Sequence, residues 1–133
     1  MTSSIMLLLV EDEVLIAEVL EDALIESGYE VVKALNGSEA LNEIENDASR
    51  FRAILTDIQL GGEKDGWALA RRAREIVPTM PIVYMSASGS HEWPSKGVPG
   101  SFMLVKPFAP AQLVTAVSTL VTEADMHSPP PQS

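Results

Sequence analysis

The sequence contains no cysteine, no long hydrophobic run and few basic residues. Without cysteine, the 133-residue chain has no disulfide and no thiolate metal site. The apolar run at 5–10 is too short to span a membrane, and the residues before it lack the basic region of a signal peptide. We therefore expect a cytoplasmic protein with no membrane insertion.

The shortage of basic residues leaves a strong negative charge. Nine lysines and arginines face 19 aspartates and glutamates, so the net charge is −10. Such a chain repels phosphate backbones, and direct binding to nucleic acid is not expected. The charge favours a cation or a basic protein surface as partner, or it serves solubility alone.

Short apolar segments alternate with helical patterns along the chain. Apolar runs of this length are typical of strands covered on both faces, and the segments between them carry apolar residues at helical spacing. This alternation predicts right-handed crossovers and one parallel sheet, which is an α/β fold. The predicted strands are 5–10, 29–35, 52–56, 81–85 and 101–105.

The helical segments differ in strength. Within the segment 89–100, residues 94–100 contain two prolines and two glycines, which cost about 3 and 1 kcal/mol each inside a helix, so any helix there is short. A final amphipathic helix ends the predicted domain, 1–124, and the proline-rich stretch 125–133 is expected to be a disordered tail or linker stub. The apolar side of the first helix comprises Ile16, Val19, Leu20, Ala23 and Leu24.

Polar side chains interrupt the chain where the predicted strands end. Glu11 and Asp12 follow the first strand, and Asp57, Ser86 and Lys106 follow the third, fourth and fifth. The carboxyl ends of parallel strands share one edge, where ligands bind in α/β sheets. An ionised carboxylate near a core costs several kcal/mol unless it is compensated, so Asp57 suggests a functional role.

The chemistry of this edge follows from its charges. Crowded carboxylates raise one another's pKa, and a hard cation such as Mg²⁺ relieves the repulsion, with the backbone carbonyl of Gln59 as a further ligand. A phosphate that enters beside the cation meets Asp57, and carboxylates are known covalent phosphate acceptors. Lys106 and the Ser86 hydroxyl are suited to hold the phosphoryl oxygens.

The motifs VEDE (10–13), LTDIQLGG (55–62), DGWALA (65–70), YMSAS (84–88) and LVKPF (104–108) together resemble the receiver domain of bacterial two-component response regulators. The resemblance covers about residues 5–122 and implies a flavodoxin-like doubly wound sheet of order 2-1-3-4-5. By this resemblance Asp57 is the phosphoacceptor, Asp12 is a more direct magnesium ligand than Glu11, Ser86 is the switch hydroxyl and Lys106 senses the phosphoryl group. It also implies a cis peptide bond before Pro107.

One position departs from the family pattern. Met103 stands where the family usually has an aromatic side chain that rotates when the hydroxyl engages phosphate. The nearby aromatics are Tyr84 and Phe102, of which Phe102 is expected on the opposite face of its strand. Trp93, in the weak segment 89–100, is a candidate partner anchor, and we expect that segment to be the mobile output surface.

The resemblance implies a signalling switch. It accepts a phosphoryl group from a histidine kinase or a histidine phosphotransfer protein and acts through contacts with a downstream protein. It is not expected to be an enzyme beyond self-phosphorylation and autodephosphorylation. The chain is alternatively the excised receiver domain of a larger regulator, or a phosphate sink.

Two other classes of protein share parts of the pattern. A flavin-binding electron carrier needs a loop rich in hydroxyls and glycine after the first strand, where this chain has Glu11-Asp12-Glu13. A phosphatase of the haloacid dehalogenase type needs a second acid two residues after its nucleophile, where this chain has Gln59.

Overall fold

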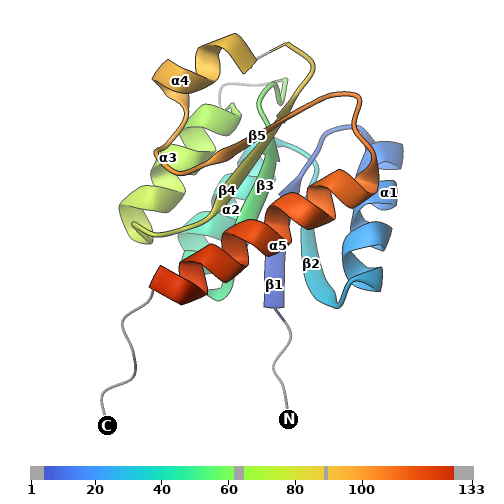
Figure 1. Cartoon of the computed structure of the whole chain (residues 1–133). Helices are drawn as coiled ribbons and strands as arrows, with labels where there is room; N and C mark the ends of the chain where they lie inside the picture. Colours follow the sequence, from blue (N-terminus) through green and yellow to red (C-terminus); the bar gives the residue numbers. More distant parts are fainter. Residues whose placement is uncertain (1–4, 62–64, 89, 128–133) are drawn as a thin grey trace, which may run out of the picture.

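The chain is described from a computed structural model, which covers residues 5–61, 65–88 and 90–127. In these residues five parallel strands form one sheet of order β2-β1-β3-β4-β5, with helices on both faces (Figure 1). The strands are β1 Ile5–Val10, β2 Tyr29–Ala34, β3 Ala53–Asp57, β4 Ile82–Ser86 and β5 Phe102–Val105. The helices are α1 Val14–Glu26, α2 Gly37–Asp47, α3 Gly66–Ile76, α4 Trp93–Lys96 and α5 Pro110–His127, with single 3₁₀ turns η1 Ala48–Arg50 and η2 Ser90–Glu92. The predicted flavodoxin-like fold and strand order are confirmed.

The central strands are buried on both faces, as their continuous apolar runs predict. Leu8 and Ile54 belong to one hydrophobic cluster, which α2 and α3 cover. Leu7 and Leu55 belong to the other, which α1 and α5 cover (Figure 1). Each fully buried leucine contributes about 1.5–3 kcal/mol, so the two clusters hold the sheet as a rigid platform for its carboxyl edge.

Side-chain caps fix the start of α2 and α3. The Asn36 side chain accepts a hydrogen bond from the Glu39 N–H (2.8 Å), and the Asp65 side chain accepts one from the Ala68 N–H (2.9 Å). Such caps satisfy backbone donors that the helix leaves unpaired, and each stabilises by about 1 kcal/mol. The Asp65 cap sets where α3 begins beside the end of β3.

Two sequence predictions need correction. Val19 was expected in the core but its side chain is 54% exposed, because Ala17, Leu20 and Leu24 form the inward face of α1. The final helix continues past residue 124 to His127, and an ion pair between Arg52 and Asp125 ties its last part to the start of β3. The remainder of the predicted tail, 128–133, lies outside the described residues.

Among the helices that the structure describes, none is both long enough and apolar enough to cross a membrane.

Candidate functional site

The polar residues predicted at the strand ends lie at one edge of the sheet. Asp57 and Ser86 are the last residues of the adjacent strands β3 and β4, and Lys106 directly follows β5. Glu11 follows β1, the other neighbour of β3. The parallel topology therefore brings these four side chains together although 95 positions separate Glu11 from Lys106.

Lys106 bridges the two buried carboxylates. Its ammonium Nζ lies 2.8 Å from Glu11 Oε1 and 3.1 Å from Asp57 Oδ2. The Glu11 residue is fully buried and the Asp57 residue is 8% exposed, so both contacts are shielded from water. A charged pair in such surroundings is strongly oriented, which gives Asp57 a defined side-chain position.

One lysine does not neutralise this cluster. Glu11, Asp12 and Asp57 each offer a carboxylate oxygen, and these oxygens lie within 4.8 Å of one another. Burial and the neighbouring Glu11 charge raise the pKa of Asp57 to about 7. Partial burial and Glu11 also raise the pKa of the exposed Asp12. The cluster therefore has an excess of negative charge that a cation would relieve.

Glu11 and Lys106 respond in the opposite sense. Burial acts to raise the pKa of Glu11, but hydrogen bonds from Lys106 and from the Glu13 N–H outweigh it and hold the pKa below its ordinary value. Burial acts to lower the pKa of Lys106, but its bonds to Glu11 and Asp57 raise it. Glu11 and Lys106 thus form a stable ion pair, whereas the ionised form of Asp57 is unfavourable in this site.

The Ser86 hydroxyl lies at the same edge and is nearly buried. Its Oγ accepts a hydrogen bond from the Ser88 N–H (3.1 Å), and its backbone carbonyl accepts one from the Lys106 N–H (2.9 Å). Ser86 therefore connects the loop after β4 to the residue that contacts Asp57. Gln59 is an exposed residue of the loop after β3, two residues beyond Asp57, and its role as a carbonyl ligand stays a prediction.

Gly66 lies against the backbone of Asp57, and the sequence motifs did not predict this role. A Cβ atom at this position would lie 2.4 Å from the Asp57 carbonyl oxygen and 2.9 Å from Ile58 Cα, so only glycine fits. The Gly66 N–H donates to the Ile58 carbonyl (2.8 Å), and Thr56 Oγ1 donates to the Asp57 carbonyl (2.8 Å). The start of α3 therefore packs directly against the backbone of Asp57. The available signal was the Asp65-Gly66 pair at a helix start.

Tyr84 fills the space next to Met103. The two residues pair across β4 and β5, and Tyr84 is fully buried with its ring 4.7 Å from that of Trp67. The Tyr84 hydroxyl accepts a hydrogen bond from the Val98 N–H (3.1 Å). An aromatic side chain thus reaches the segment between β4 and β5 from position 84, and the predicted switch role of Tyr84 and Met103 stays a prediction.

Trp93 has an internal contact. Its Nε1–H donates to Ser101 Oγ (2.8 Å), its ring lies against Gly97, and its side chain packs on the cluster that contains Tyr84. This packing explains why Gly97 carries no side chain, while the role of Trp93 as a partner anchor stays a prediction. The peptide bond between Lys106 and Pro107 is cis, as the resemblance implied.

The fold and the site together define an α/β domain with an acidic cluster and a lysine at its carboxyl edge. Residues 7–118 match the family model of the response regulator receiver domain. The chain therefore belongs to the response regulator receiver family of two-component systems. This finding decides against the flavin carrier and the haloacid dehalogenase phosphatase.

Relatives of two lengths match the chain. It is 32% identical over 120 residues to the response regulator receiver protein CpdR of Brucella abortus, covering 89% of this chain and 98% of CpdR. It is 36% identical over 118 residues to the transcriptional regulatory protein CusR of Escherichia coli K12, covering 86% of this chain and 50% of CusR. Indeed, the chain spans about half the length of several curated regulators that it matches.

Solved structures agree with the fold. A response regulator receiver protein from Sinorhizobium medicae is 40% identical, with a TM-score of 0.88 over 92% of this chain and 98% of that one. The receiver domain of the hybrid histidine kinase CckA is 30% identical, with a TM-score of 0.73 over 87% of this chain and 98% of that one.

Proposed function

We propose that the chain is a phosphoacceptor switch in which Asp57 receives a phosphoryl group. The observation that carries this proposal is the position of Asp57: it ends a central strand within the acidic cluster and contacts Lys106. The donor is a histidine kinase or a histidine phosphotransfer protein, and the phosphorylated form acts on a downstream protein. The chain itself turns over no external substrate beyond its own phosphorylation and dephosphorylation.

The transfer exchanges one phosphorus bond for another. A carboxylate oxygen of Asp57 attacks phosphorus, the new P–O bond forms as the P–N bond to the donor imidazole breaks, and the bonding electron pair stays on nitrogen. The Lys106 ammonium, already 3.1 Å from Asp57 Oδ2, is placed to attract a phosphoryl oxygen. The Ser86 hydroxyl, at the end of the adjacent strand, is placed to donate to another.

The residues present fit a divalent cation. Glu11, Asp12 and Asp57 supply hard carboxylate oxygens, the ligand type that Mg²⁺ prefers, and their net charge exceeds that of Lys106. These residues, with the Gln59 carbonyl, would hold the ion. When bound, Mg²⁺ supplies positive charge against the phosphoryl oxygens and the carboxylates.

Intact-mass spectrometry tests the proposal directly. Incubation with acetyl phosphate and Mg²⁺ is expected to add the mass of one HPO₃ group, and chelation with EDTA is expected to prevent it. Asp57→Asn is expected to remove the added mass, whereas Asp22→Asn, an exposed change on α1, is expected to leave it. Equal labelling of Asp57→Asn and the wild type would refute Asp57 as the acceptor.

A second measurement separates a switch from a phosphate sink. A switch changes its surface when phosphorylated, whereas a sink needs only to accept and release the group. We expect beryllofluoride with Mg²⁺ to change amide hydrogen exchange in 90–101, because Ser86 precedes this segment and Tyr84 contacts Val98 within it. Unchanged exchange there, with Asp57 fully phosphorylated in the mass assay, would favour the sink.

A further inference from the structure

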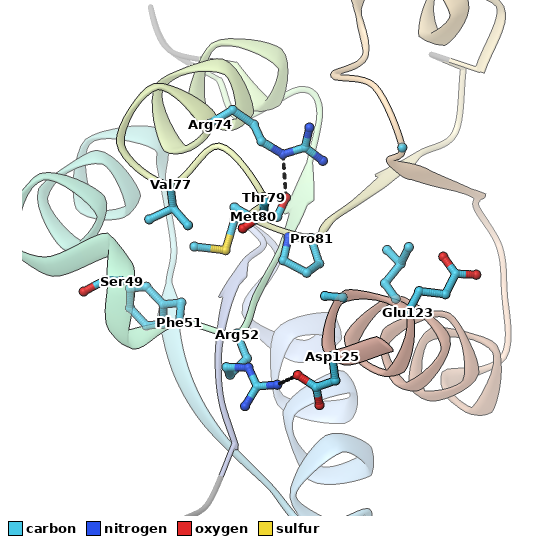
Figure 2. Close-up of a pocket in the computed structure, with 13 residues that line it drawn as sticks. Ser49, Phe51, Arg52, Arg74, Val77, Thr79, Met80, Pro81, Glu123 and Asp125 are labelled. Atoms are coloured by element: carbon cyan, nitrogen blue, oxygen red, sulfur yellow. Dashed lines mark hydrogen bonds and ion pairs between the residues drawn. The ribbon is translucent and has the colours of Figure 1, made fainter. Parts of the chain in front are cut away.

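A cavity lies at the opposite edge of the sheet from Asp57. Its volume is about 600 Å³, within the range of small-molecule sites. Arg52 and Pro81 line it directly before β3 and β4, so it sits at the amino ends of the strands. The end of α3 and the last turns of α5 contribute the other walls, which places the cavity between helices from the two faces of the sheet (Figure 2).

Arg74 is the polar group of this cavity that lacks an acidic partner. Its Nε donates to the Met80 carbonyl (2.6 Å), as the dashed line in Figure 2 shows, and this bond fixes the plane of the guanidinium. Both Nη atoms remain available for a carboxylate to bind end-on through two parallel hydrogen bonds. Among the residues that the structure describes, Arg50, Arg52 and Arg72 each pair with a carboxylate, but no carboxylate lies within ion-pair distance of Arg74.

Arg74 is only partly exposed to solvent. Its side chain is half-buried, and this burial lowers the pKa of the guanidinium. A half-buried cation without a counter-ion loses hydration that a bound anion would replace. This feature stands out in a chain with a net charge of −10.

The other charged residues of the cavity are Arg52, Asp125 and Glu123. Arg52 pairs with Asp125 at the opposite wall, so these two charges compensate each other (Figure 2). Glu123 also lines the cavity, from an exposed position on α5. The uncharged part of the wall combines polar residues, Ser49 and Thr79, with apolar ones that include Phe51, Val77, Met80, Pro81 and Leu120.

We propose that this cavity binds a small organic carboxylate, with the carboxylate on the two Nη atoms of Arg74 and an apolar body against Val77, Pro81 and Leu120. The fork of Arg74 matches a planar carboxylate better than a tetrahedral phosphate. The apolar wall favours a ligand with a ring or a branched chain over a bare anion. This site does not depend on phosphorylation of Asp57.

Benzoate is the probe for the first test. In a titration followed by ¹H–¹⁵N NMR, benzoate is expected to shift the amides of Met80, Gly100 and Ala124 saturably. Benzyl alcohol, which lacks the charge, and inorganic phosphate, which lacks the ring, are each expected to bind at least several-fold more weakly. Benzoate shifts that are absent, or that centre on Lys106, would overturn the proposal. Phosphate binding as tight as that of benzoate would refute the apolar half of the site.

Matched variants make the test specific. Arg74→Gln is expected to weaken benzoate binding about tenfold, the loss expected for a charge-assisted hydrogen bond. Arg71→Gln removes the same charge from an exposed position on the same helix and is expected to have no effect. Ala124→Leu leaves Arg74 in place but fills the cavity from α5, and it is expected to abolish the shifts. Equal binding by the wild type and either Arg74→Gln or Ala124→Leu would refute the site.

Discussion

Asp57→Asn is expected to stabilise the metal-free protein above neutral pH. Asp57 is 8% exposed and lies beside Glu11, and the pKa of its carboxyl is raised from 3.8 to about 7. A carboxyl whose pKa is raised on folding holds its proton more tightly in the folded state than in the unfolded state. As pH rises from about 4 to 7, the ionisation of Asp57 therefore removes stability, and the loss is complete above about pH 7.

The magnitude follows from that shift. A difference of about 3 pKa units corresponds to about 4 kcal/mol, at 1.36 kcal/mol per unit. Asparagine removes this cost but leaves Lys106 with a neutral acceptor, which forfeits about 1–2 kcal/mol of a charge-assisted bond. The expected net gain in the free energy of unfolding is about 2 kcal/mol at pH 8, and below pH 4 the two proteins are expected to differ little.

Urea unfolding in EDTA, followed by circular dichroism at pH 5, 6, 7 and 8, measures this difference. The gap between Asp57→Asn and the wild type is expected to widen from pH 5 to about pH 7 and to level off by pH 8. The exposed Asp22→Asn serves as the control and is expected to stay within about 0.5 kcal/mol of the wild type. A difference in the free energy of unfolding that is independent of pH would show that the ionisation of Asp57 does not destabilise the fold. An Asp57→Asn protein that is less stable than the wild type at pH 8 would show the same.

Three further substitutions test the surroundings of the site. Lys106→Met is expected to raise the pKa of Asp57 further, measured by ¹³C NMR of its carboxyl carbon, and a lowered pKa would contradict the role of the ammonium. Gly66→Ala is expected to cost about 2 kcal/mol in urea unfolding, because its Cβ overlaps the backbone of Asp57, and unchanged stability would contradict that contact. Tyr84→Phe leaves the buried N–H of Val98 unpaired, so it is expected to cost about 1–3 kcal/mol and to speed exchange of that amide, while equal exchange in both proteins would show that the bond is not maintained.

The sheet was predictable from the sequence because its central strands are short, continuous apolar runs. β1 Ile5–Val10 matches its predicted range, and β3 and β4 each begin and end one residue later than predicted. The shift arises because hydrophobicity indicates which residues are buried, whereas pairing such as that of Asp57 with Met85 sets where a strand ends. The convergence of Asp57 and Lys106 was predictable because parallel strands place all their carboxyl ends at one edge.

Other features depend on contacts that no local pattern encodes. Periodicity placed Val19 in the core because α1 has more apolar residues than its inward face holds, and Val14 and Leu15 are likewise exposed. The continuation of α5 beyond residue 124 involves the ion pair of Asp125 with Arg52, 73 positions away. The orientation of Arg74 toward the Met80 carbonyl depends on the turn after α3. The sequence alone therefore could not predict that its guanidinium has no carboxylate partner.

The contact between Gly66 and the Asp57 carbonyl has a mechanical consequence. The backbone on the α3 side of Asp57 is already at the closest approach that glycine permits, so residue 57 has no room to retreat toward that helix. If Asp57 is phosphorylated as proposed, we expect the group to be accommodated on the other side, where the Lys106 side chain contacts Asp57 and β4 ends at Ser86. We therefore expect the response to have a direction, with α3 held in place and displacement toward β4, β5 and the segment between them.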